Sequence, residues 1–374
     1  MKRFFLGMAA KYGALRQTAR HTFCHGRESD IKELKKYLGE RYSGEAITCK
    51  NGRSGLALAL RAFFKRGEKV LVNGFTCYAV YEGIQAAGLI PVFVDISQED
   101  LNFDYQALEK AAKESQASGI IIQNSLGNPV DIERIESLAK KYHLTIIEDL
   151  AHSAGVKYGD GREAGTVGAA VAFSFGKDKS VDTVNGGAVV FREEMKRKVE
   201  MPHERARVSD TLRARFYPML AGLCRGLTAI HLGGILMRLL VKIHWVEKSA
   251  DNHLDTTRQI SRFEARLALE QFRGFREAGE RPIREFVLVR EREKVLEMLK
   301  KAGYYFDSIW YKKPVAPERY YKKVHFNEAE CPSSVYIAEH IINLPTYYSR
   351  GDLKRAREII KPYIINEGKN GKVE

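Results

Sequence analysis

The feature that most constrains the fold is a regular alternation of apolar runs and amphipathic segments between about residue 44 and residue 150. The apolar runs are rich in valine and isoleucine, as in KVLVN, IPVFVDI and GIIIQNS. Segments of roughly ten residues with helical spacing separate them. Short runs of this kind are typical of parallel strands that are joined by helices and buried on both faces. The pattern therefore predicts an α/β domain with a mostly parallel sheet.

The pattern changes after Phe191. A basic stretch runs to Arg215 and is followed by the apolar segment FYPMLAGLCRGLTAIHLGGILMRLLVKIHW. Its longest uncharged run, from Gly226 to Met237, has twelve residues, whereas a membrane-spanning helix needs about 20. We expect a helix that packs on its own domain or on a second subunit. A second interpretation is peripheral contact of residues 216–245 with a membrane surface.

Helical spacing returns near Ser261 in FEARLALEQFRGFREAGE, and short strands are expected around YFDSIWY and IINLP. A last helix is expected in GDLKRAREIIKPYI. These segments predict two domains: a large one over residues 1–250, with an apolar, basic insertion at about 195–250, and a small C-terminal α/β domain over 251–374. Two domains in one chain usually leave a cleft between them.

Charge and cysteine content narrow the class of protein. The formal net charge of +14 favours phosphorylated metabolites or an anionic surface, but the basic residues are scattered, so we expect no nucleic-acid partner. The apolar run near the N-terminus is broken by Lys11, which argues against a secretory signal. The cysteines are odd in number and form no CxxC pair, which predicts neither disulfides nor a metal site and suits the cytoplasm: Cys24, Cys49, Cys77, Cys224 and Cys331.

Small residues open the predicted helix NGRSGLALAL at residues 51–60. The N-terminus of a helix presents N–H groups and the positive end of the helix dipole, so Gly52, Arg53 and Ser54 could hold a phosphate. The same residue types also occur at strand-to-helix turns for capping alone. This stretch is therefore a candidate phosphate site only in combination with others.

Acidic residues end the predicted strand of LTIIEDLAHSAG. Glu148 and Asp149 stand at its carboxyl end, where open α/β sheets bind ligands, and His152 follows three residues later. A carboxylate at this place could pair with a protonated ring nitrogen. The alternative is an acid that caps the next helix.

Two lysines, Lys177 and Lys179, lie in the stretch FSFGKDKSVDTVNGGAVVF at residues 173–191. A lysine that attacks a carbonyl must be neutral part of the time, which requires partial burial or positive surroundings. The aromatic residues and the Gly186–Gly187 pair predict a closely packed loop that leads into a strand. A solvated surface charge is the alternative for either lysine.

Taken in this order, the three stretches resemble the DegT/StrS-type sugar aminotransferases, which are pyridoxal-phosphate enzymes of fold type I. The lysine motif of that family has Ser-Phe, three residues, the lysine and a Gly-Gly pair that starts seven positions later. Ser174–Phe175 and Gly186–Gly187 have this spacing from Lys179. Lys177 fits neither spacing. The acid motif is matched by residues 148–152 and the phosphate turn by residues 51–54, and the resemblance extends over roughly residues 30–360, apart from 195–250.

The resemblance implies a role for each matched residue. Lys179 would hold pyridoxal 5′-phosphate covalently and later carry a proton between two carbon centres. Asp149 would keep the ring nitrogen protonated, and His152 would contact the ring near its phenolic oxygen. The remaining implied contacts are with the cofactor phosphate, from Gly52, Arg53, Ser54 and the Ser174 hydroxyl.

Two departures from the family pattern affect the cofactor site. Many relatives carry an aromatic residue that stacks on the ring at the position of Cys77, so either Cys77 or Tyr78 is expected there. Near Thr257 the family usually has an asparagine that a second subunit lends to the cofactor phosphate. In this chain Arg258 is the obvious substitute.

The resemblance implies a cytoplasmic homodimer that transfers an amino group, with glutamate as the expected donor, to a nucleotide-linked keto sugar. The product would serve polysaccharide or secondary-metabolite biosynthesis. One alternative is a sugar dehydratase on the same scaffold, although such relatives typically replace the lysine with histidine. Another is a non-catalytic regulator or scaffold that binds the cofactor at a membrane surface.

Overall fold

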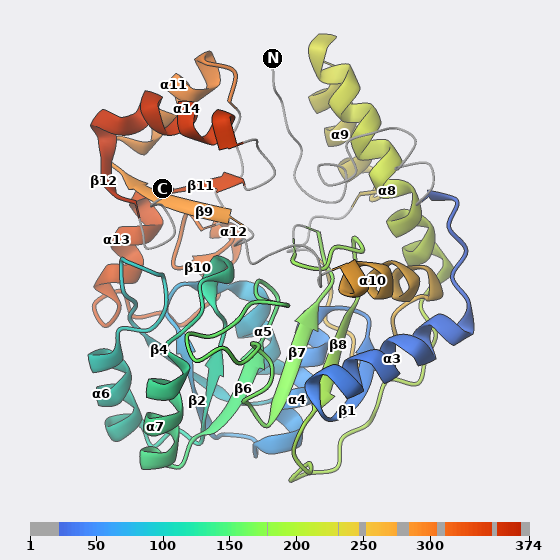
Figure 1. Ribbon diagram of the computed structural model, residues 1–374, viewed down its shortest axis with the longest axis vertical. Coiled ribbons are helices and arrows are strands. Elements are labelled where there is room, and N and C mark those ends of the chain that lie inside the picture. The colour runs from blue at the N-terminus through green and yellow to red at the C-terminus, as the bar shows by residue number, and fades with distance from the viewer. Residues whose placement is uncertain are drawn as a thin grey trace.

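The fold is described from a computed structural model of the chain (Figure 1). Two sequence predictions lie outside the described residues: the N-terminal segment up to residue 21 and most of the strand expected around YFDSIWY. The structure describes residues 22–177, 179–230, 232–246, 252–274, 284–304, 311–345 and 350–367, without the side chains of residues 225, 228, 229 and 345.

A seven-stranded sheet forms the centre of the large domain and confirms the predicted α/β class. Its strand order is β1-β8-β7-β6-β5-β2-β4. β8 runs antiparallel to both of its neighbours, and the other pairings are parallel. The strands are β1 (Glu45–Cys49), β2 (Lys69–Asn73), β4 (Ile90–Val94), β5 (Gly119–Ile122), β6 (Thr145–Asp149), β7 (Ala170–Ser174) and β8 (Gly187–Phe191).

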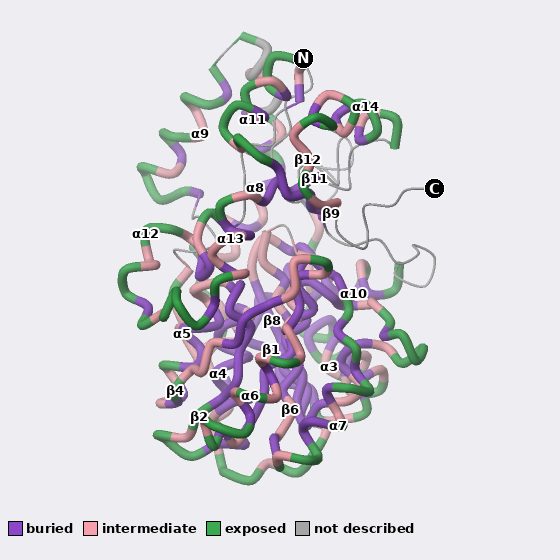
Figure 2. Tube along the Cα trace, turned by 90° about the vertical axis from the view of Figure 1, so that its left-hand side faces the viewer, coloured by how far each residue is buried: buried purple, intermediate pink, exposed green. Residues whose placement is uncertain are grey.

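Helices cover both faces of this sheet, because successive residues of a strand point to opposite sides. Leu71 packs toward one layer of helices, while Val70 and Val72 pack toward the other. Figure 1 shows α3, α7 and α10 in front of the sheet, and Figure 2 shows the buried residues concentrated along the strands. The first layer has α3 (Glu28–Tyr42), α6 (Tyr105–Ser115), α7 (Ile132–Tyr142) and α10 (Arg262–Gly274), and the second has α4 (Gly52–Phe63) and α5 (Tyr78–Ala86).

The C-terminal part contains a three-stranded antiparallel sheet in the order β11-β9-β12. The expected strand IINLP is β11, and the expected last helix is α14. A short parallel pair, β3 (Thr76–Cys77) with β10 (Val315–Ala316), joins this part to the large domain. The other elements are β9 (Arg284–Val289), β11 (Ile341–Pro345), β12 (Ile364–Asn366), α11 (Arg292–Lys301), α12 (Glu318–Tyr321), α13 (Pro332–His340), α14 (Arg350–Ile360) and the 3₁₀ turns Ser125–Gly127 (η1) and Lys361–Tyr363 (η4).

The domain boundary after residue 250 stays a prediction. Leu269 and Phe272 of α10, which follow that boundary, are fully buried in the core between α3 and the large sheet. We therefore propose that the C-terminal domain begins at β9.

The predicted insertion forms a helical hairpin. α8 (Val208–Gly226) leads through a 3₁₀ turn, η2 (Leu227–Ile230), into α9 (Gly233–Lys242). Figure 1 shows the hairpin rising from the large domain beside α10. In the part of the chain that the structure describes, no helix has both the length and the apolar content needed to cross a membrane.

Candidate active site

A cavity of about 300 Å³ lies at the carboxyl edge of the large sheet. Parallel strands end at the same edge, so the residues after β1, β5, β6 and β7 come together there. Helix α8 and the β10 segment complete the wall. Of the residues that the sequence predicted for the site, those that line the cavity are Gly52, Arg53, Cys77, Asp149, His152, Ser174 and Lys179.

The predicted phosphate turn forms the N-terminus of α4. Asn51 caps the helix, and its side-chain oxygen accepts a hydrogen bond from the Ser54 backbone N–H at 3.0 Å. The Ser54 hydroxyl donates to the same oxygen at 2.7 Å and accepts from the Asp255 backbone N–H at 3.0 Å. Ser54 is fully buried and is not part of the cavity wall. Its hydroxyl is engaged by the cap of its own helix and by Asp255, so a direct contact of Ser54 with a phosphate stays a prediction.

The turn and the end of β7 touch so closely that only glycine fits at position 52. A Cβ atom on Gly52 would lie 2.5 Å from the Ser174 Cβ. Gly187 of β8 approaches the same turn, because a Cβ there would lie 2.6 Å from the Asn51 carbonyl carbon. The second glycine of the Gly-Gly pair thus lets β8 pack directly beneath the phosphate turn.

Arg53 lines the cavity, but its guanidinium group forms an ion pair with Glu82 of α5. The side chain is buried, so this pair ties α4 to α5 inside the wall. The backbone at the start of α4, which is the positive end of the helix dipole, is therefore the part of the turn best placed for an anion.

The two neighbouring acids at the end of β6 have different functions, because they point to opposite sides of the strand. Glu148 accepts hydrogen bonds from the Gly165, Val167 and Gly168 backbone N–H groups and from Tyr158, so it holds a loop in place. Asp149 faces the cavity and is buried. Burial raises the pKa of Asp149, and the neighbouring Lys179 opposes this rise.

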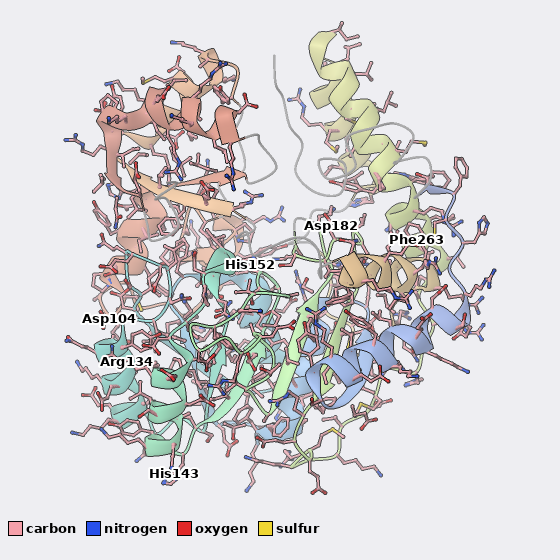
Figure 3. All side chains as sticks on the ribbon, viewed as in Figure 1. Asp104, Arg134, His143, His152, Asp182 and Phe263 are labelled. Carbon is pink, nitrogen blue, oxygen red and sulfur yellow. The ribbon has the colours of Figure 1, made fainter. Side chains whose placement is uncertain are left out.

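His152 and Lys179 form a close pair. The His152 Nε2 atom lies 2.9 Å from the Lys179 Nζ atom, and Figure 3 labels His152 at the upper edge of the sheet. Burial and then the positive charges of Lys179 and Arg284 hold the pKa of His152 well below its usual value, so the imidazole is neutral. The Leu126 N–H donates to Nδ1 at 3.3 Å, which places the ring proton on Nε2.

Lys177 lines the same cavity but lies against α8. Its Nζ atom is 4.8 Å from the centre of the Tyr217 ring, in a cation–π contact. The loop that carries both lysines is held at Asp182, which Figure 3 labels near α10. Gln271 of α10 accepts from the Asp182 N–H at 3.0 Å and donates to the Asp182 carbonyl at 2.7 Å.

The structure distinguishes the two candidates for a ring contact. Cys77 lines the cavity, and its Sγ accepts from the Ala79 N–H at 3.5 Å. Tyr78 instead stacks on Tyr320, with ring centres 4.5 Å apart, and is not among the residues of the wall. A cofactor contact of Tyr78 therefore has no support in the structure, whereas Cys77 is in position.

Sequence reasoning missed Tyr311, a buried residue of the wall that packs on Phe75 with ring centres 4.6 Å apart. Burial raises the pKa of Tyr311 well above its usual value, with further contributions from Cys77 and Asp149. Tyr311 thus supplies an aromatic side chain beside Cys77. Tyr311 lies far along the sequence from the other stretches, so no local pattern pointed to it.

Other residues of the wall were also missed. Lys50 and Gln123 directly follow strands β1 and β5, so the strand-end rule could have found them. Asn252 lies between two asparagines: it accepts from Asn51 at 3.3 Å and donates to Asn185 at 2.6 Å. The remaining unpredicted polar or aromatic residues of the wall include Asp210, Arg213, Tyr217 and Trp245.

Arg258, the expected substitute for the family's asparagine, is placed elsewhere. Its guanidinium group forms ion pairs with Asp255 and with Glu204, and it is not among the residues of the cavity wall. Within this chain, Asn252 is the amide side chain from this region that reaches the cavity.

The residues present fit pyridoxal 5′-phosphate, the cofactor that the resemblance implies. The start of α4 suits its phosphate, and the closely packed Gly52 leaves room for backbone N–H groups at that point. Asp149 offers a buried carboxylate for the ring nitrogen, and Lys179 offers an amine on the same cavity. These groups come from three separate elements and converge on one site.

Comparisons with known proteins identify a family for this chain. The DegT/DnrJ/EryC1/StrS aminotransferase family model matches residues 14–360. GDP-perosamine synthase of Escherichia coli O157:H7 is 34% identical over 156 residues, which are 41% of this chain and 42% of that protein. GDP-4-keto-6-deoxy-D-mannose 3-dehydratase of Yersinia pseudotuberculosis is 31% identical over 170 residues, 44% of this chain and 42% of that protein. The chain spans less than half the length of the curated relatives it matches.

Solved structures share the fold. An aminotransferase of this family from Brucella abortus superposes with a TM-score of 0.66 and 19% identity, over 96% of this chain and 99% of that one. Other solved neighbours hold pyridoxal phosphate or pyridoxamine phosphate. With a family match over almost the whole chain and the site residues on one cavity, the protein belongs to the DegT/DnrJ/EryC1/StrS aminotransferase family, whose cofactor is pyridoxal phosphate.

Proposed function

We propose that the protein transfers an amino group from glutamate to a keto sugar carried on a nucleotide. The observation that carries this proposal is the hydrogen bond between a neutral His152 and the amine of Lys179, beside the buried Asp149. The contact holds the Lys179 amine on the cavity, where it can reach a carbonyl group of a ligand. Two of the named relatives act on GDP-linked sugars by name, which supports the substrate class.

The residues of the cavity have separate roles in this proposal. The bound cofactor supplies an electron sink for negative charge at a substrate carbon. Asp149 holds and orients the ring nitrogen, and the start of α4 binds the phosphate. The Lys179 amine accepts a proton at Nζ and returns it, and His152 keeps that amine pointed into the cavity.

Charge at the cavity supports anionic substrates. The basic residues Lys50, Lys177 and Arg213 line the cavity. Among the described residues of the wall, the acids are Asp149 and Asp210. Lys50 lies 3.9 Å from Asp210, which neutralises part of this charge. The excess of cations suits the two carboxylates of glutamate and the diphosphate of a nucleotide sugar. A homodimer, a cytoplasmic location and a role in polysaccharide or secondary-metabolite assembly are implied by the resemblance and stay predictions.

Dehydration of a keto sugar is the second candidate function, because one curated relative is a dehydratase by name. The resemblance links that activity to a histidine in place of the lysine, and this chain has Lys179. We therefore favour transamination. A regulator or scaffold without turnover is the third possibility, and it predicts a bound cofactor that glutamate does not change.

The test uses the full chain loaded with pyridoxal phosphate. We expect glutamate to change the absorbance of the bound cofactor and to yield 2-oxoglutarate. A panel of nucleotide-linked keto sugars is then added, and mass spectrometry identifies the amino sugar. Lys179→Ala should abolish both reactions, while the matched control Lys157→Ala should retain turnover, because Lys157 is exposed and is not among the residues of the cavity wall.

Two results would contradict the proposal. Turnover that survives in Lys179→Ala would remove the assigned nucleophile. Loss of a hydroxyl group from the sugar without gain of nitrogen would instead establish the dehydratase.

A further inference from the structure

The α8–α9 hairpin, residues 208–243, exposes two stripes of apolar side chains. Along α9 and its ends the exposed residues recur every three or four positions, which places them on one helix face. The exposed fractions of the stripe residues lie between 39% and 75%, an unusual state for so many large apolar side chains in one segment. The α9 stripe is Leu232, Ile235, Leu239 and Ile243, and the α8 stripe is Val208, Leu212, Met219 and Leu223.

These stripes are not the faces that hold the hairpin together. The inner contact uses other residues, among them Tyr217 and Ala221 of α8 and Leu240 of α9, which are buried against one another. α9 is therefore apolar both toward α8 and away from it. Figure 2 shows α9 at the edge of the molecule with exposed residues along its length. An amphipathic helix that only packed on its own domain would carry polar residues on the outer face.

The charge around the stripes is strongly positive. Residues 205–246 contain seven lysines and arginines and a single acid, Asp210. Asp210 is engaged with Lys50 and Arg213, each at 3.9 Å, on the cavity side. On the outer face of α9, Arg238 and Lys242 are exposed between the apolar residues.

This charge decides among the possible occupants of the outer face. A second copy of the chain, related by a two-fold axis, would set one basic hairpin against another. The N-terminal segment 1–21 is also basic, with five lysines and arginines and no acid. A nucleic acid would match the charge but would leave the apolar stripes without a partner. An anionic lipid surface satisfies both the apolar stripes and the positive charge.

We propose that the outer face of the α8–α9 hairpin docks on the surface of a membrane that contains anionic lipids. Leu232, Ile235, Leu239 and Ile243 would enter the boundary between headgroups and acyl chains, while Arg238 and Lys242 would contact lipid phosphates. The same hairpin lines the cavity through Arg213 and Tyr217. Docking would therefore hold the mouth of the candidate active site beside the membrane, whichever reaction it performs.

Vesicle flotation with the full chain tests this proposal. The vesicles contain phosphatidylcholine alone or a mixture with phosphatidylglycerol. We expect flotation with the anionic mixture only and release at raised salt. Ile235→Glu/Leu239→Glu should lower vesicle affinity at least about tenfold, since each side chain forfeits its apolar transfer energy. The matched control Ile90→Glu/Ile365→Glu alters apolar residues of similar exposure outside the hairpin and should bind as the unaltered protein does.

A second variant removes charge and leaves the apolar stripes intact. Arg238→Gln/Lys242→Gln should weaken binding about fivefold per removed charge. If circular dichroism melting finds that Ile235→Glu/Leu239→Glu is unfolded, Arg238→Gln/Lys242→Gln tests the docking proposal in its place. The proposal is overturned if the protein floats with neither vesicle, or if flotation is unchanged in both hairpin variants. A change of oligomeric mass in Ile235→Glu/Leu239→Glu without any vesicle binding would assign the face to a second copy instead.

Discussion

Replacing Gly52 with alanine tests the contact between the phosphate turn and the end of β7. The new Cβ would lie 2.5 Å from the Ser174 Cβ and 2.9 Å from its Oγ. Carbon atoms in contact prefer about 3.5–4.0 Å, so the start of α4 must move away from β7 by about 1 Å. Overpacking of this kind costs about 1–3 kcal/mol. We expect the free energy of unfolding to fall by that amount, and pyridoxal phosphate to bind about five- to 150-fold more weakly if the displacement falls on the turn.

The assay is a titration of pyridoxal phosphate followed by absorbance, together with urea unfolding of the same samples. Gly176→Ala is the matched control, because Gly176 lines the same cavity but a Cβ there meets its nearest atom at an ordinary 3.5 Å. Adding Ser174→Gly to Gly52→Ala removes the Cβ and Oγ that clash and should restore part of the stability. The reasoning is refuted if Gly52→Ala binds the cofactor and unfolds as the unaltered protein does.

Two further predictions concern Glu264 and Gln271, which both belong to α10. Burial raises the pKa of Glu264 to about 7, above its unfolded value of about 4.3. The contribution of Glu264 to stability is therefore complete below about pH 4.3 and is lost as the pH rises through about 7. Urea midpoints measured from pH 5 to pH 8 should show a smaller decline in Glu264→Gln, and an identical decline would contradict this assignment. Gln271→Ala should speed hydrogen exchange of the Asp182 N–H and weaken cofactor binding, since both hydrogen bonds to the lysine loop are lost. Gln271→Glu can still accept a hydrogen bond but no longer donate one, so its exchange rate should lie between those of the unaltered protein and Gln271→Ala. Equal exchange in all three proteins would exclude a role of Gln271 in holding the lysine loop.

The sequence predicted the parts of the site that depend on local pattern. Alternating apolar runs placed the strands, and residues at strand ends, such as Asp149, share one edge of a parallel sheet. Motif spacing separated Lys179 from Lys177, and the structure pairs Lys179 with His152. These features were readable because strand direction and residue order within a loop are properties of a short stretch of chain.

Other features depend on contacts that no short stretch contains. Cys77 and Tyr78 are neighbours in sequence, yet one faces the cavity and the other stacks on Tyr320 of a distant helix. Ser54 matches a phosphate motif, but its hydroxyl is engaged by the cap of its own helix and by Asp255.

By itself, then, the sequence determined the class of fold, the edge of the sheet that carries the chemistry and the lysine assigned to it, because hydrophobic periodicity and motif spacing act along the chain. Only the tertiary structure decided that Tyr311 and the α8 residues close the cavity and that one face of α9 stays exposed. The physical reason is that burial is set by whichever distant segments pack together, and an apolar stripe at helical spacing reads the same whether another segment covers it or not.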